Sequence, residues 1–297
     1  MPRIDAHLHV FTKASPEFPR ETSDVWPPER EEPVEKLLGE METNQIDQAV
    51  LVQMAGTSLE QHRYLMQCLK NYPNRFLGIG LIPDGHPNPA EHMAQLTDDT
   101  GIIGFRLSTF GGPRDIFAKM DVRDFETYPI WEYAAKHDCV LWLYPQAIEA
   151  HLLPYLIQAF PQVRIVLNHL GMAPGKGKFS WDGLGRPQIQ VTSYNLAMHT
   201  TYRLARFENV TVHLSGQYAF SKEGFPYQDL AGWHRSLLND FGPKRLMWAT
   251  DFPWILEDPG YGELTTVVEK LLPNLTESEL ADIMGRNAKR ILRFPDL

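Results

Sequence analysis

Eight short apolar stretches, spaced along the whole chain, constrain its fold more than any other feature of the sequence. Most of them are continuous rather than alternating, as expected for parallel strands that are covered on both faces. Strands are predicted at 2–11, 48–53, 76–81, 102–107, 139–144, 163–168, 210–214 and 245–250. The first one differs because its apolar and polar residues alternate, which indicates a strand with two different faces.

Helical periodicity fills most of the intervals between these strands. Helices are expected after Pro33, Ser58, Asn88 and Thr276, and over 125–137, 149–160, 198–207 and 228–240. Eight repeated β-α units form a (β/α)8 barrel, for which about 250 residues is typical. We therefore predict one α/β TIM-barrel domain over residues 1–297, with a doubly wound open sheet as the alternative fold.

The loops give the predicted barrel a functional end. Segments that enter strands are short, such as 71–75 and 160–162. Several segments that leave strands are long, namely 11–32, 108–123, 170–195, 216–227 and 252–262. Active sites of TIM barrels lie where the strands end and these loops begin.

Four residues with acid–base side chains fall at these strand ends. His7 and His9 share one face of the first strand, because residues i and i+2 point the same way. His169 ends the sixth strand and Asp251 ends the eighth. The first two alone could be chance histidines of an edge strand, but four such residues at one end of a barrel predict a site.

Short motifs at these positions resemble the amidohydrolase superfamily. They are Asp5-Ala6-His7-Leu8-His9, Asn168-His169-Leu170-Gly171, Leu214-Ser215-Gly216 and Thr250-Asp251-Phe252-Pro253. Within it, the chain is similar to the amidohydrolase-2 branch, which includes 2-pyrone-4,6-dicarboxylate lactonase and sugar lactonases. Gly104-Phe105-Arg106 and Gly285-Arg286-Asn287-Ala288 resemble motifs of that branch. The resemblance spans the chain from end to end.

The resemblance implies a role for each residue of the predicted site. His7, His9 and Asp251 would bind a divalent metal ion or, as in some lactonases, work without one. Asp251 would take a proton from the attacking water, and His169 would face the substrate. Arg106 would bind a carboxylate or a carbonyl of the substrate.

Two further residues are expected to bind substrate. Gln146 follows the fifth strand, and Trp254 lies in a long exit loop, as do Trp26 and Trp181. The three tryptophans either line a ring-binding pocket or anchor their loops.

Arg106 also has a purely structural alternative. It could pair with an acidic residue of the loop that contains Asp115 and Asp121. An unpaired Arg106 would instead be available to a substrate.

The middle strands offer few metal ligands. Metal-dependent members of the superfamily usually add Lys, Glu or His there, whereas the fifth strand of this chain ends Tyr144-Pro145-Gln146. Catalytic zinc sites use three protein ligands and a water, so His7, His9 and Asp251 just suffice. We predict at most one divalent ion per chain, with zinc as the expected ion and a metal-free site as the alternative.

Hydrolysis of a small lactone is the predicted reaction. A carboxylate near imidazoles can deprotonate water, and histidines or a metal can stabilise the oxyanion. No G-x-S-x-G motif is present, so a covalent acyl-enzyme is not expected. The dicarboxylate lactonases place an Arg shortly after the sixth-strand His, where this chain has Gly171-Met172-Ala173-Pro174, so a pyrone dicarboxylate is not the expected substrate. The alternatives are a zinc-dependent decarboxylase of an unsaturated carboxylic acid and a non-catalytic ligand-binding barrel.

Composition narrows the partners and the compartment. A net charge of −9 argues against nucleic acid and anionic membranes, and no apolar run approaches the roughly 18 residues that span a bilayer. Cys68 and Cys139 are two lone thiols, expected to be buried and reduced in a cytoplasmic protein. The expected partner is a small-molecule substrate, and self-association into a homo-oligomer is left open.

The remaining histidines show no grouping in the sequence. His213, inside the seventh strand, is interpreted as a core residue rather than a ligand. Surface or helix-cap positions are expected for His62, His86, His92, His137, His151, His199 and His234.

Overall fold

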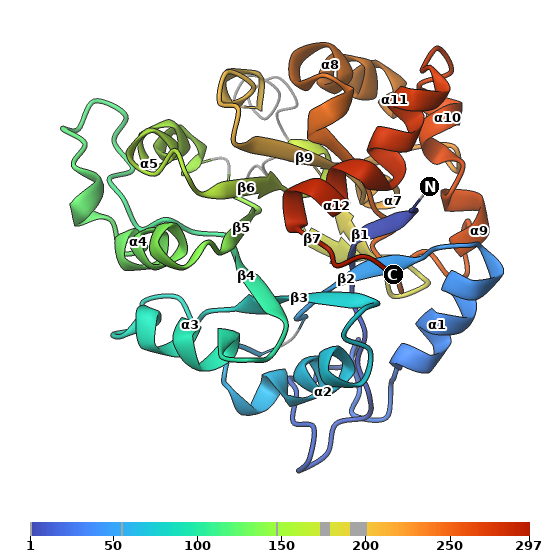
Figure 1. Ribbon diagram of the computed structural model, residues 1–297, viewed down its shortest axis with the longest axis horizontal. Helices are drawn as coiled ribbons and strands as arrows, with labels where there is room; N and C mark the ends of the chain where they lie inside the picture. The colour runs from blue at the N-terminus through green and yellow to red at the C-terminus, as the bar shows by residue number, and fades with distance from the viewer. Residues whose placement is uncertain (1, 55, 147, 173–178, 191–200) are drawn as a thin grey trace.

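Eight parallel strands form a nearly closed barrel with helices around its outside (Figure 1). The structure, a computed structural model, describes residues 2–54, 56–146, 148–172, 179–190 and 201–297. The barrel strands are β1 (Ile4–Leu8), β2 (Gln48–Val52), β3 (Phe76–Leu81), β4 (Ile102–Leu107), β5 (Val140–Leu143), β6 (Arg164–Leu167), β9 (Val210–Leu214) and β10 (Leu246–Trp248). They pair in this order. The predicted TIM barrel is confirmed, and the open sheet is not observed.

Helices follow most of the strands, as the sequence predicts. Those in the first half of the chain are α1 (Val34–Thr43), α2 (Arg63–Asn71), α3 (Pro89–Thr97), α4 (Tyr128–His137) and α5 (Leu153–Ala159). Those in the second half are α7 (Gln217–Phe220), α8 (Ala231–Phe241), α9 (Tyr261–Leu264), α10 (Val267–Leu271), α11 (Glu277–Ala281) and α12 (Asn287–Leu292). None of the described helices is long and apolar enough to cross a membrane.

Two segments differ from the expected pattern. The loop predicted at 170–195 contains a small antiparallel hairpin, β7 (Phe179–Trp181) and β8 (Pro187–Ile189). Of the helix predicted at 198–207, residues 201–204 are helical, and its first residues lie outside the described part of the chain.

Three histidines expected at surface or helix-cap positions, His62, His92 and His234, are buried. His62 stands at the N-cap of α2, so the prediction was wrong for His92 and His234 only. Hydrogen bonds to the backbone explain how two of them tolerate burial. The Leu81 N–H donates to His62 Nε2 at 2.9 Å, and His234 Nδ1 lies 2.9 Å from the Leu230 carbonyl. His199 lies outside the described residues. Cys68 and Cys139 are free and buried, as predicted.

The barrel is packed in two layers. One set of buried side chains fills its interior and includes Ile4, Val50 and Trp142. Ala288 and Leu292 of α12 join this set, so α12 closes the end of the barrel where the strands begin (Figure 1). A larger set packs the strands against the outer helices. Because α12 covers the end where the strands begin, the opposite end, where the strands finish, is the one available for a site.

The seam between β1 and β10 is closed around Asp5. The backbone N–H of Asp251 donates to the His7 carbonyl at 2.9 Å, and that of His9 donates to Phe252 at 2.8 Å. The fully buried Asp5 carboxylate accepts hydrogen bonds from the Thr250 N–H at 2.9 Å and the Tyr261 hydroxyl at 3.0 Å. Asp5 therefore joins the first strand to the last.

Burial of Asp5 predicts a pH-dependent contribution to stability. Desolvation raises the pKa of Asp5 to about 6, although its hydrogen bonds act in the opposite direction. Because the folded-state pKa exceeds the unfolded one, near 3.9, this contribution is fully present below pH 4 and is lost as the pH rises through 6. The difference between the folded and unfolded pKa of Asp5 corresponds to about 3 kcal/mol in the free energy of unfolding.

We expect Asp5→Asn to remove this dependence, because an amide does not ionise and can still accept from the Thr250 N–H. The check is urea unfolding of both proteins at pH 4 and pH 7. From pH 4 to pH 7, the free energy of unfolding of wild type should fall by up to about 3 kcal/mol more than that of the variant. If the difference in free energy of unfolding between wild type and Asp5→Asn is the same at pH 4 and pH 7, the raised pKa of Asp5 is contradicted.

Candidate active site

A β-bulge in β1 aims the first histidine into the barrel. The β1–β2 register shifts between Asp5 and Leu8. Ala6 packs with the interior set, and the next residue, His7, also contacts the interior Trp142. Bulges place one extra residue in a strand and re-aim side chains. His7 therefore lies with His9 at the mouth of the barrel, while Asp5 points away from it.

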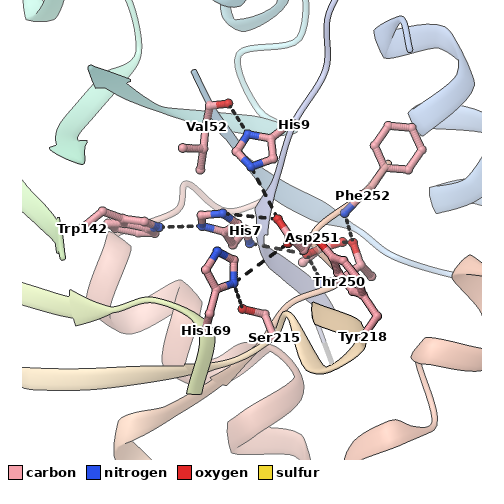
Figure 2. A network of polar contacts seen from close by, with 11 residues as sticks. His7, His9, Val52, Trp142, His169, Ser215, Tyr218, Thr250, Asp251 and Phe252 are labelled. Carbon is pink, nitrogen blue, oxygen red and sulfur yellow. Dashed lines mark hydrogen bonds and ion pairs between the residues drawn. The ribbon is translucent and has the colours of Figure 1, made fainter. Parts of the chain in front are cut away.

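Asp251 is the centre of the polar network at this mouth (Figure 2). Its Oδ1 atom lies 3.6 Å from His7 Nε2 and 3.4 Å from His9 Nε2, and its Oδ2 atom lies 4.0 Å from His169 Nδ1. The Tyr218 hydroxyl donates to Oδ2 at 2.7 Å. The structure thus brings all four predicted acid–base residues together.

The carboxyl group of Asp251 is held in its ionised form. Burial on its own would raise the pKa of Asp251, but the neighbouring His169 and His9 and the hydrogen bond from Tyr218 outweigh it and lower the pKa to about 2. Oδ1 has no hydrogen-bond partner within the described residues. A buried carboxylate oxygen in this state can accept a proton from a water molecule.

Backbone strain fixes the two residues that end β6 and β10. His169 has φ 46° and Asp251 has φ 61°, in the left-handed region that non-glycine residues seldom adopt. Such strain concentrates at functional sites. Gly216, with φ 71°, lies against the His169 ring, and a Cβ there would come within 2.7 Å of Nδ1. Ser215 Oγ lies 3.1 Å from the same nitrogen. The Leu214-Ser215-Gly216 motif therefore positions His169.

The tautomer of His7 is set by Trp142. The Trp142 indole N–H donates to His7 Nδ1 at 3.0 Å, and an indole nitrogen is a donor only. In the neutral ring the proton therefore sits on Nε2, facing Asp251. Burial, followed by the charges of His169 and His9, lowers the pKa of His7 well below its usual range, so the neutral ring is the form present.

This tautomer decides how well the site fits a metal ion. Ligand atoms of His7, His169 and Asp251 lie within 4.8 Å of one another and form a possible metal-binding cluster. Metal-bound histidines normally donate their other ring N–H to an oxygen. His9 does so, since its Nδ1 lies 2.8 Å from the Val52 carbonyl. His7 has the reverse arrangement, because its Nδ1 accepts and its Nε2 carries the proton. The donor set therefore fits a three-ligand zinc site poorly.

Arg106 has a free guanidinium at the end of β4. No carboxylate of the described residues lies within ion-pair distance of it, and Asp121 pairs with Arg123 instead. The guanidinium lies 5.4 Å from the centre of the Tyr144 ring. Burial lowers the pKa of Arg106, and the nearby Asp251 opposes that shift. The arrangement leaves one unpaired cation beside the acid–base residues.

A cavity of about 180 Å³ opens above these groups. Asp251, His9, His169 and Arg106 line it. The predicted substrate-binding residue Trp254 lines it too, together with Trp26 and Trp181. Gln146 is exposed and is not one of the lining residues, so the structure does not bring it to this cavity.

Three residues of the site were not singled out in the sequence. Tyr218 lies two positions after the Leu214-Ser215-Gly216 motif, and Tyr144 follows β5 directly. Their closeness to a motif and to a strand end could have indicated both residues. The Tyr144 hydroxyl is buried and has no hydrogen-bond partner within the described residues. Trp142 lies inside a strand, and no sequence pattern indicates that it contacts the site. His213 is buried in the interior, as expected for a core residue, with its ring 5.5 Å from that of His7.

Fold and site together define a TIM-barrel enzyme with an Asp/His centre at the strand ends. The family model described as Amidohydrolase matches residues 4–294, and the chain belongs to this family. It is 24% identical to an L-fucono-1,5-lactonase of Burkholderia multivorans over 99% of this chain and 97% of the relative. It is also 24% identical to a 4-sulfomuconolactone hydrolase of Rhizobium radiobacter, over 91% of this chain and 84% of the relative.

A solved structure resembles the whole fold. It is an amidohydrolase from Burkholderia multivorans with bound zinc, which superposes with a TM-score of 0.74 at 21% identity. The match covers 99% of this chain and 100% of that one. At this identity the likeness concerns the fold.

Proposed function

We propose that the protein hydrolyses a small lactone and that Asp251 activates the water. The observation that carries the proposal is the geometry of Asp251, a residue that lines the cavity and whose buried Oδ1 atom has no hydrogen-bond partner within the described residues. The names of the two relatives, a fuconolactonase and a sulfomuconolactone hydrolase, support the same class of reaction.

In the proposed reaction, Asp251 Oδ1 takes a proton from water while the water oxygen attacks the lactone carbonyl. We assign stabilisation of the developing oxyanion to the hydroxyl of Tyr144 and the ring of His169, two of the polar residues that line the cavity. Burial lowers the pKa of His169 to about 4, although Asp251 opposes this shift, so the ring acts as a neutral donor. Preorganised donors of this kind often contribute more than any other effect to the rate of acyl transfer.

Collapse of the tetrahedral intermediate then breaks the ring C–O bond. The proton on Asp251 passes to the departing alkoxide, which restores the carboxylate. The product is a hydroxy acid, which releases one proton to solvent at neutral pH. We propose that Arg106 binds a carboxylate or another strongly polar group of the substrate, because its guanidinium has no acidic partner in the described chain.

The test is proton release on mixing the protein with a panel of lactones, read with a pH indicator, beside a measurement of carbon dioxide from unsaturated acids. Proton release is the expected result. Carbon dioxide without lactone opening would favour the decarboxylase alternative. Silence in both assays, with binding retained, would favour a non-catalytic barrel.

We also propose that catalysis does not depend on a metal ion. Each chain would bind at most one divalent ion, and that ion would be zinc. The basis is the Trp142 hydrogen bond, which leaves His7 without a lone pair for an ion. Activity should therefore survive a chelator, and elemental analysis should give at most one ion per chain. We expect Trp142→Phe to raise zinc affinity about 10- to 100-fold, since outer contacts of ligands have effects of this size.

Zinc titration of wild type and Trp142→Phe by calorimetry is the measurement. Full zinc occupancy in wild type, together with loss of activity on chelation, would overturn the proposal.

Two reduced thiols, Cys68 and Cys139, support a reducing compartment such as the cytoplasm as the place of action.

A further inference from the structure

Polar and apolar groups are segregated within the active-site cavity. The polar side chains that line it within the described residues all lie at strand ends or in α7, around Asp251. The apolar lining side chains come from several segments that follow strands, and three of the exit loops form the outer wall. Trp26, Phe179, Trp181 and Trp254 are the aromatic residues of these three loops, and Phe220 of α7 lines the cavity as well.

Three tryptophans form the centre of this outer wall. Trp26 and Trp254 stack with ring centres 5.3 Å apart and planes 27° apart. Trp181 of β7 is tilted against both, at 5.9 Å and 6.0 Å. Phe179 stands at the rim and is 58% exposed. Trp26 is also stacked on Phe11, with ring centres 5.6 Å apart, so the wall is a packed aromatic cluster that borders the cavity.

Such a wall discriminates between two kinds of lactone. A flat apolar group gains by leaving water and by packing against aromatic rings. A hydroxyl group in the same place gives up its hydrogen bonds to water and finds no side-chain acceptor among the described aromatic wall residues, whose only polar side-chain groups are indole N–H donors, and this is unfavourable.

We propose that the substrate is a lactone that carries an aromatic or similarly flat apolar group, bound against Trp26, Trp181 and Trp254, rather than a polyhydroxylated sugar lactone. This inference rests on the proposed lactonase function. It departs from the sugar substrate named for the fuconolactonase relative. Tryptophans can also stack on the apolar face of a sugar, and the experiment includes that case.

Binding of lactams tests the wall without any turnover. The probes are three neutral six-membered lactams: δ-valerolactam, its benzo-fused analogue 1,4-dihydro-3(2H)-isoquinolinone, and gluconolactam. Calorimetry with the wild-type protein should give the tightest binding for the benzo-fused compound, by roughly tenfold over δ-valerolactam, as expected for one aromatic contact plus apolar burial. Equal or tighter binding of gluconolactam would overturn the inference.

Turnover of the matching lactones separates this inference from the proposed function. They are δ-valerolactone, 3-isochromanone and glucono-1,5-lactone, with each kcat/KM divided by the rate of alkaline hydrolysis. We expect 3-isochromanone to rank first. Faster glucono-1,5-lactone would overturn the inference while leaving lactone hydrolysis intact. If none is opened but the benzo-fused lactam still binds best, the proposed reaction fails and the wall specificity stands.

Trp181→Ala supplies the matched variant. It should weaken binding of the benzo-fused lactam roughly tenfold and change δ-valerolactam less than twofold, while Trp181→Phe should keep most of the preference. Phe117→Ala is the control, because Phe117 is an aromatic residue outside the cavity with 89% of its surface exposed. Equal losses for both lactams in Trp181→Ala would show that Trp181 only supports its hairpin, which would overturn the inference.

Discussion

Asp251→Asn is expected to lower kcat for lactone opening by about a hundred- to ten-thousandfold. The amide has nearly the same shape as the carboxylate and can still accept the hydrogen bond from Tyr218, which is 2.7 Å long in the wild-type protein. It cannot take a proton from water, so only the general-base step is lost. Steady-state kinetics, with the melting temperature as a check of folding, measure the effect.

Tyr218→Phe is the companion variant. It leaves the Asp251 carboxylate in place and removes one of the contacts that lower its pKa. Its kcat should therefore fall less than that of Asp251→Asn, and the acid side of the pH–rate profile should move to higher pH. Activity of Asp251→Asn within threefold of wild type would exclude the assigned role.

Arg106→Met is expected to have the second large effect, on KM. Removing a buried charged partner typically costs about 2–5 kcal/mol, which corresponds to about 30-fold to a few thousandfold in affinity. The effect should appear with a carboxylated lactone and be nearly absent with a neutral one. A suitable pair is γ-butyrolactone with either a carboxylate or a methyl group at the γ carbon.

Arg123→Met is the control for Arg106→Met. Arg123 is exposed and paired with Asp121, so its loss should leave both KM values unchanged. A loss in Arg106→Met that is equal for charged and neutral lactones, with a large drop in melting temperature, would mean that Arg106 stabilises the barrel instead.

The barrel was predictable because its strands carry their own signal. β3 and β4 begin and end at the predicted residues, since β3 is a continuous apolar segment and β4 is apolar except for Arg106. β10 is shorter than predicted, Leu246–Trp248 instead of 245–250. Its last predicted residues lead into the left-handed turn at Asp251, and no local pattern indicates that turn.

The candidate site was predictable only as far as residues stand at strand ends. His7, His9, His169 and Asp251 meet because parallel strands finish at one end of a barrel. The bond from Trp142 to His7 joins residues 135 positions apart, and no spacing rule relates them. The bulge that separates the direction of Asp5 from that of His7 is likewise a property of strand register.

The stacked tryptophans of the cavity wall also act as an intrinsic optical probe. Indole rings with centres 5.3–6.0 Å apart couple electronically, so the emission of Trp26, Trp181 and Trp254 depends on their mutual geometry. Any molecule that slides between or against them changes that emission. Ligand discovery for this protein can therefore proceed by fluorescence titration of the unlabelled chain, before any turnover assay is in hand.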